Sequence, residues 1–226
     1  MKAINLFRLN VCGDAHLTRV KKAINYINEL CSSNKESRRA LGNLLRLQYG
    51  KWTKTLALGD FLDFNETIMQ NKAEIGAAQF FGKFRAYAFE EYIYRLLKEK
   101  VYINKPLELF WGEKCLVWQK GGKHYEFEFD VSIGNKAEAV VDPAIVFDAK
   151  VELDSSRLKT ALASFTILKN WKPEAKCVLV YVIKNVDKTL LWLAKNWADG
   201  IFQFSLENNE TEAFIDYVTA CLRNYM

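Results

Sequence analysis

The chain has 226 residues, of which 50% are hydrophobic and 14% aromatic, so it can bury one large core or two smaller ones. This composition excludes a disordered chain. No run of about 18 apolar residues occurs, and the first ten residues lack the features of a signal peptide, so we expect an intracellular, cytoplasmic protein with no membrane partner. The net charge of +5 permits a polyanionic partner without requiring one.

The first 80 residues have a mainly helical pattern. Helical spacing is kept by Leu17, Val20, Ile24, Ile27 and Leu30, and again by Leu41, Leu44 and Leu45, where we expect the helix to close at Gly50. No low-complexity linker separates this half from the rest of the chain. We therefore expect residues 1–80 to form a helical accessory region and residues 81–226 to form the main unit.

From Gly82 the pattern predicts a helix, three strands, a helix, a strand, a helix, a strand and a helix. The first helix covers 83–100, and the first strands lie within 109–119, 124–133 and 144–153, with turns at Gly121-Gly122 and Gly134-Asn135. A helix capped by Asp154, a strand at 177–183, a helix capped by Asp187 that ends near Gly200, and a strand at 201–206 follow. This order predicts an α/β fold with a mixed central sheet flanked by helices.

Acidic residues interrupt two of these strands on one face. Alternation places Asp130 on the same face as Glu126 and Glu128, and it places Asp148 beside Lys150. If residues 134–144 connect an antiparallel pair, Asp130 can lie next to Asp148. Such an acid-rich face is also typical of the solvated side of a sheet, and this alternative stays open.

Two adjacent carboxylates repel each other unless a cation lies between them. A magnesium ion, which prefers a few carboxylate oxygens plus water, would resolve this repulsion at Asp130 and Asp148. Such a site polarises a phosphodiester and activates water. Lys150 is placed to orient or deprotonate the attacking water, or to hold the phosphate. The pattern therefore indicates phosphodiester hydrolysis.

Residues 82–206 resemble the PD-(D/E)xK nuclease superfamily, which has a restriction-endonuclease-like core. The resemblance rests on the order of elements, on Asp130, on the Asp148-Ala149-Lys150 triplet, and on Phe89-Glu90 in the preceding helix. Glu90 shares a helix face with Ile93 and Leu97 and is expected to point at the sheet, whereas Glu91 shares a face with Arg95 and Lys98.

The resemblance implies four catalytic residues, Glu90, Asp130, Asp148 and Lys150. It also implies a Mg²⁺ site, in which Mn²⁺ can substitute, formed by Asp130, Asp148, the carbonyl of Ala149, and Glu90 directly or through water. The sequence departs from the family in one respect, because Phe129 replaces the proline expected before Asp130. Asp142-Pro143 is interpreted as a turn or strand entry.

By the same resemblance we expect a type II-like restriction endonuclease that cuts double-stranded DNA as a homodimer, with residues 1–80 supplying dimer contacts or recognition. Arg157 and Lys159 open the helix after Lys150 and either meet phosphate or form an ordinary solvated turn. Three alternatives remain: a structure-specific repair or Holliday-junction nuclease, a DNA-binding module without catalysis, and a scaffold domain.

Overall fold

The computed structural model describes residues 22–137, 139–223 and 225. Leu17 and Val20 lie outside this part of the chain. Five helices precede the first strand: α1 (Ala23–Cys31), α2 (Glu36–Thr55), α3 (Leu58–Gln70), α4 (Lys72–Ile75) and α5 (Ala78–Lys100). The predicted helical character of this half is confirmed, because Ile24, Ile27 and Leu30 all lie on α1. Helix α2 does not end at Gly50 as predicted, since its left-handed C-cap is Leu56 (φ 53°), whose N–H donates to the Trp52 carbonyl.

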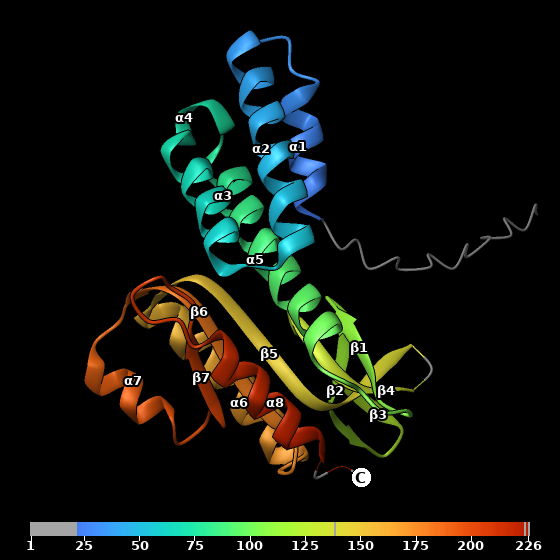
Figure 1. Cartoon of the computed structure of the whole chain (residues 1–226). Helices are drawn as coiled ribbons and strands as arrows, with labels where there is room; N and C mark the ends of the chain where they lie inside the picture. Colours follow the sequence, from blue (N-terminus) through green and yellow to red (C-terminus); the bar gives the residue numbers. More distant parts are fainter. Residues whose placement is uncertain (1–21, 138, 224, 226) are drawn as a thin grey trace, which may run out of the picture.

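Helix α5 belongs to two parts of the molecule. Its 23 residues correspond to a length of about 35 Å. Its first turns pack among α1, α2 and α3, and its last turns lie against the sheet (Figure 1). Aromatic rings link the helices, and the Phe61 ring stacks on both Phe89 and Tyr92 of α5 with centroids 5.6 and 4.7 Å apart. One continuous hydrophobic cluster therefore extends from the helical bundle onto one face of the sheet.

Seven strands form one mixed sheet. They are β1 (Glu108–Trp111), β2 (Lys114–Lys120), β3 (Lys123–Glu128), β4 (Val131–Ala137), β5 (Val140–Asp154), β6 (Lys176–Asn185) and β7 (Gly200–Gln203). The long strand β5 pairs antiparallel with β4 and parallel with β6 and, at one position, β2; β7 extends the sheet parallel to β6. The predicted change from antiparallel to parallel pairing is confirmed.

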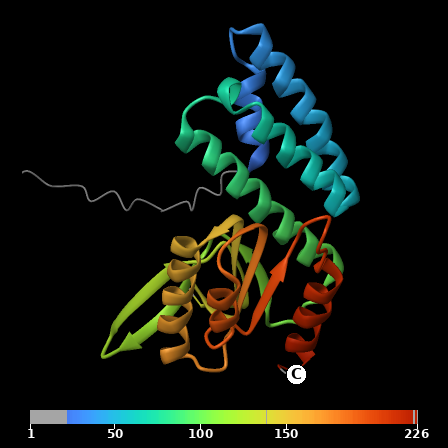
Figure 2. The same ribbon diagram turned by 90° about the vertical axis from the view of Figure 1, so that its left-hand side faces the viewer.

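The strands predicted at 109–119 and 124–133 are each broken into two. Gly112 has a left-handed backbone (φ 62°), which favours glycine, and its N–H donates to the Asp130 carbonyl at 3.0 Å. The two breaks thus lie side by side. Beyond them β2 and β3 leave β1 and β4 and form a hairpin, with the predicted turn at Gly121-Gly122. The hairpin projects from the body of the sheet (Figure 2).

The predicted turn at Gly134-Asn135 is wrong, because both residues lie within β4. A Cβ atom on Gly134 would come within 2.3 Å of the Asp142 carbonyl oxygen, so glycine is required here for close approach of the backbones. The same place carries a register shift between β4 and β5. Asp142 and Pro143 lie near the start of β5 at this irregularity, in agreement with the interpretation as a strand entry.

Helices cover both faces of the sheet. On one face lie α6 (Ser155–Trp171) and α7 (Lys188–Ala194), and on the other lie α5 and α8 (Thr211–Arg223). Asp154 and Asp187 cap α6 and α7 as predicted, each accepting hydrogen bonds from backbone N–H groups of the first turn. Helix α7 is shorter than predicted, because consecutive tight turns follow Ala194 before β7 begins at Gly200.

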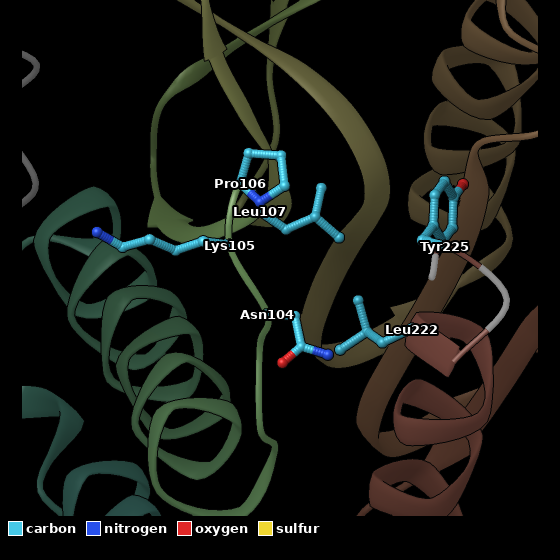
Figure 3. A pocket seen from close by; sticks show the side chains of 6 residues that line it. All are labelled: Asn104, Lys105, Pro106, Leu107, Leu222 and Tyr225. Carbon is cyan, nitrogen blue, oxygen red and sulfur yellow. The ribbon is translucent and has the colours of Figure 1, made fainter.

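The C-terminal end of the chain packs against the connection between α5 and β1. Leu222 and Tyr225 face Asn104 and Leu107 across a pocket of about 430 Å³ (Figure 3). The Tyr225 hydroxyl donates to the carbonyls of Ala144 and Glu174 at 3.1 and 3.2 Å. This end is therefore tied to β5 and to the loop before β6. Among the described residues, no helix has the length and apolar character needed to cross a membrane.

Candidate active site

The break between β3 and β4 positions Asp130. Because the β4 ladder ends at the pair Val131 and Phe147, the next N–H of β5 on that side has no strand partner. The Asp130 carboxylate takes its place, and Oδ2 accepts from the Ala149 N–H at 2.7 Å. Asp130 and Asp148 therefore lie beside each other, as the alternation of the sequence predicts.

Lys150 lies between the two aspartates. Its Nζ is 3.4 Å from Asp130 Oδ2 and 2.5 Å from Asp148 Oδ1. Burial alone would lower the Lys150 pKa, but the two carboxylates outweigh burial and raise it. The exposed fractions of these three side chains are only 16 to 26%, so the charges interact with little screening by solvent.

Glu90 reaches this cluster from α5, where it is 8% exposed. Its Oε2 accepts from Trp111 Nε1 of β1 at 3.3 Å. Burial, followed by repulsion from Asp130, raises the pKa of Glu90, and burial also raises that of Asp148. The structure therefore brings together three carboxylates with one lysine among them, and burial disfavours the charged forms of Glu90 and Asp148.

At pH 8 in EDTA, the free energy of unfolding of the Glu90→Gln variant is expected to exceed that of the wild type by about 1 to 3 kcal/mol. The folded protein holds the Glu90 proton more tightly than the unfolded chain, whose ordinary pKa is 4.5. Holding this proton therefore stabilises the folded state fully below pH 4.5, and the stabilisation is lost as the pH rises through the higher pKa of Glu90 in the folded protein. Glutamine keeps the acceptor for Trp111 and has no charge to bury. Urea denaturation across pH measures the difference, and a gap that does not grow with pH would contradict this account.

The oxygen atoms fit a hard divalent cation better than a soft one. Within the ranges that the structure describes, no three histidine, cysteine, aspartate or glutamate side chains converge as a ready-made metal site. Magnesium, however, is commonly held by one or two carboxylates plus water. The buried Asp148 Oδ1 is paired with Lys150 Nζ at 2.5 Å, so an oxygen ligand and a balancing cation already lie together here. Asp130 and Asp148 thus fit such an ion.

Two neighbours of the cluster, Tyr87 and Trp111, are not indicated by the sequence analysis, whereas alternation does place Glu128 on the face of Asp130. Burial and the carboxylates Glu90, Glu128 and Asp130 raise the pKa of Tyr87, which precedes Glu90 by three residues on the same helix face. Glu128, at the end of β3, in turn has its pKa raised by burial and by Asp130. The helical spacing from Glu90 could have indicated Tyr87. Trp111 carries no such local signal, because its contact with Glu90 depends on how β1 packs against α5.

Arg157 forms its hydrogen bonds and ion pairs outside the cluster of Glu90, Asp130, Asp148 and Lys150. Its guanidinium is 3.1 Å from Asp154 and donates to the Glu152 carbonyl at 3.0 Å, so it is held at the end of β5. Lys159 is exposed on the first turns of α6. Both residues lie in the first turns of α6, directly after β5, and their contact with phosphate stays a prediction.

The mixed sheet flanked by helices, with acids at the point where the antiparallel ladder ends, defines a restriction-endonuclease-like fold. Among solved structures, the chain is similar to one described as the native BbvCI A2B2 tetramer, which is a restriction endonuclease. The TM-score is 0.55 at 11% identity, over 90% of this chain and 96% of that one. No protein family and no curated protein matches the sequence. At this identity the likeness shows the fold alone.

Proposed function

We propose that this protein is a magnesium-dependent endodeoxyribonuclease. The observation that carries the proposal is the cluster in which Asp130 and Asp148 flank Lys150, with the buried Glu90 alongside. Holding these acids together with little solvent costs free energy, and such costly arrangements are concentrated at functional sites. A restriction-endonuclease-like fold supports the same conclusion.

Each residue has a proposed role. Asp130 and Asp148 would hold magnesium, the Ala149 carbonyl would add a ligand, and Glu90 would complete the set directly or through water; manganese would substitute. When bound, the metal would polarise the phosphodiester and activate water. Lys150 would donate to the attacking water or to a phosphate oxygen and offset the developing negative charge. The hydrogen bond from the Ala149 N–H to Asp130 would fix the position of Asp130 relative to Asp148 on β5.

The proposed biological role is that of a type II-like restriction endonuclease acting on double-stranded DNA. Such an enzyme needs two active sites to cut two strands, so we propose a homodimer. The similar structure named above is a tetramer of two kinds of subunit, which supports assembly in general. Residues 1–80 would provide dimer contacts or sequence recognition, residues 81–226 would form the nuclease core, and Arg157 and Lys159 would contact phosphates.

The proposal is tested by incubating wild type and Lys150→Ala with plasmid, linear duplex, branched junction, single-stranded DNA and RNA, with magnesium or with EDTA. We expect discrete duplex fragments that require magnesium and disappear in the variant. Lys188→Ala, an exposed lysine on α7, is the matched control and should cut at the wild-type rate.

Each other outcome has a definite meaning. Cutting confined to junctions would assign the protein to structure-specific repair. Salt-sensitive binding with or without magnesium, and no cleavage of any substrate, would leave a DNA-binding module. Neither binding nor cleavage by folded protein, with magnesium or manganese, would leave a scaffold domain.

A further inference from the structure

A second pocket lies next to the candidate active site. It has a volume of about 440 Å³, within the range of small-molecule sites, and is formed by the C-terminal half of α5, by β1 and by the residue before α1. Its walls include Lys22, Tyr94, Arg95, Lys98, Phe110 and Trp111. Trp111 belongs to both places, because its indole N–H donates to Glu90. The pocket and the acid cluster therefore share a wall.

The rim of this pocket is positively charged. Lys22 and Lys98 are both exposed, and neither forms an ion pair within the described part of the chain. Arg95 is paired with the buried Glu91, and Glu113, the one acid among the described lining residues, is paired with Lys136 at 2.8 Å. Two lysines are thus left to attract an anion, as in the phosphate contacts of nucleic-acid-binding proteins.

The floor of the pocket is aromatic. Tyr94 and Trp111 stack on each other with ring centroids 5.5 Å apart and an angle of 27° between the planes, and Tyr94, the less buried of the two, presents its ring to the pocket. An aromatic floor beneath a cationic rim suits a ligand that has both a flat ring and a phosphate. A duplex backbone alone would use the lysines and leave the aromatic floor uncovered.

The spacing from the acids also fits a nucleotide. Tyr94 and Lys98 follow Glu90 by four and eight residues, which corresponds to about 6 and 12 Å along α5. Successive nucleotides of one strand are about 3.4 Å apart along a duplex axis. The pocket therefore lies two to four nucleotides from a bond held at the acid cluster.

We propose that this pocket binds one unpaired nucleotide of the DNA substrate, with the base on the aromatic pair Tyr94 and Trp111 and the phosphate at Lys22 and Lys98. The inference rests on the nuclease function proposed above and adds that the substrate has, or acquires, a nucleotide out of the helical stack two to four positions from the cleaved bond. Stacking of one base on an aromatic ring would make the pocket a measurable determinant of affinity.

The test compares two fluorescein-labelled duplexes of equal length, one fully paired and one with a single unpaired nucleotide, by fluorescence anisotropy in EDTA. We expect the wild type to bind the second duplex about tenfold more tightly, and Tyr94→Leu to lose that preference. Lys22→Ala/Lys98→Ala should weaken both complexes and reduce the salt dependence by about two counterions. The matched control, Lys188→Ala/Lys195→Ala on and after α7, should change neither quantity.

Equal affinity of the wild type for the two duplexes, or a preference that survives in Tyr94→Leu, would overturn the proposal. Thermal melting of each variant shows whether it is folded before its binding is interpreted. Because EDTA prevents metal-dependent cleavage, the result is independent of catalysis. If the protein prefers the duplex with the unpaired nucleotide but does not cleave DNA in magnesium, only the proposed nuclease function is refuted. If it cleaves DNA but binds both duplexes equally, only the proposed role of the pocket is refuted.

Discussion

Replacing Asp148 with asparagine is expected to reduce magnesium-dependent DNA cleavage by about 100-fold or more while the protein stays folded. The substitution keeps the shape of the side chain and removes the negative charge that would hold the metal. Because burial raises the pKa of Asp148, loss of this charge should leave the melting temperature in EDTA unchanged or higher. Single-turnover cleavage and thermal melting measure the two effects on the same preparation.

Metal binding gives this experiment a second readout. We expect magnesium to raise the melting temperature of the wild type, since a ligand that binds only the folded state stabilises it, and to have no such effect on Asp148→Asn. Asp216→Asn, an exposed aspartate on α8, is the matched control. Wild-type cleavage by Asp148→Asn would remove this residue from the catalytic machinery, whatever the metal does to stability.

The second large effect is expected at Glu91, where Glu91→Ala should lower the free energy of unfolding by about 3 to 5 kcal/mol. Glu91 is completely buried. Its carboxylate accepts from the Ala23 N–H at 3.1 Å, the Tyr49 hydroxyl at 2.7 Å and Arg95 Nε at 2.9 Å. Removal would leave Arg95 without its carboxylate and two further donors without an acceptor. A loss of this size is a large part of a typical total stability of 5 to 15 kcal/mol.

Urea denaturation followed by circular dichroism measures this loss. Glu99→Ala is the control on the same helix, where the side chain is exposed, and it should change the free energy of unfolding by less than about 0.5 kcal/mol. A loss at Glu91 no greater than at Glu99 would show that the buried network is not stabilising. Glu91→Gln should fall between the two, because it keeps one acceptor oxygen and removes the charge.

Much of the site follows from periodicity. Alternation along β5 places Asp148 and Lys150 together, and the antiparallel pairing of β4 with β5 brings Asp130 beside them, as predicted. Helical spacing likewise placed Glu90 towards the sheet, where it is buried. These relations are local, or depend on one strand pairing, so they can be derived from the order of residues.

The errors lie where tertiary packing overrides local pattern. Glu91 shares a helix face with Arg95, as predicted, and pairs with it, but helical spacing alone does not show that α1 and α2 cover it and make it a buried acceptor. Glycine is typical of turns, so a turn was predicted at Gly134. In the structure this position needs glycine because the backbone of β5 passes too close to leave room for a side chain. The division of the strands at Gly112 and Asp130 depends on a bond between two residues that are distant in sequence.

The position of Glu90 and Glu91 side by side on α5 has a consequence for protein engineering. Glu91 is fixed to α1 and α2, and the adjacent Glu90 faces the acid cluster, so the rotation of this one helix about its axis sets both. A chimera that exchanges the helical bundle must therefore carry the whole of Ala78–Lys100 together with its partners. If the junction lay inside that helix, a mismatch in the graft would rotate the helix about its axis. The Glu90 carboxylate would then move relative to Asp130.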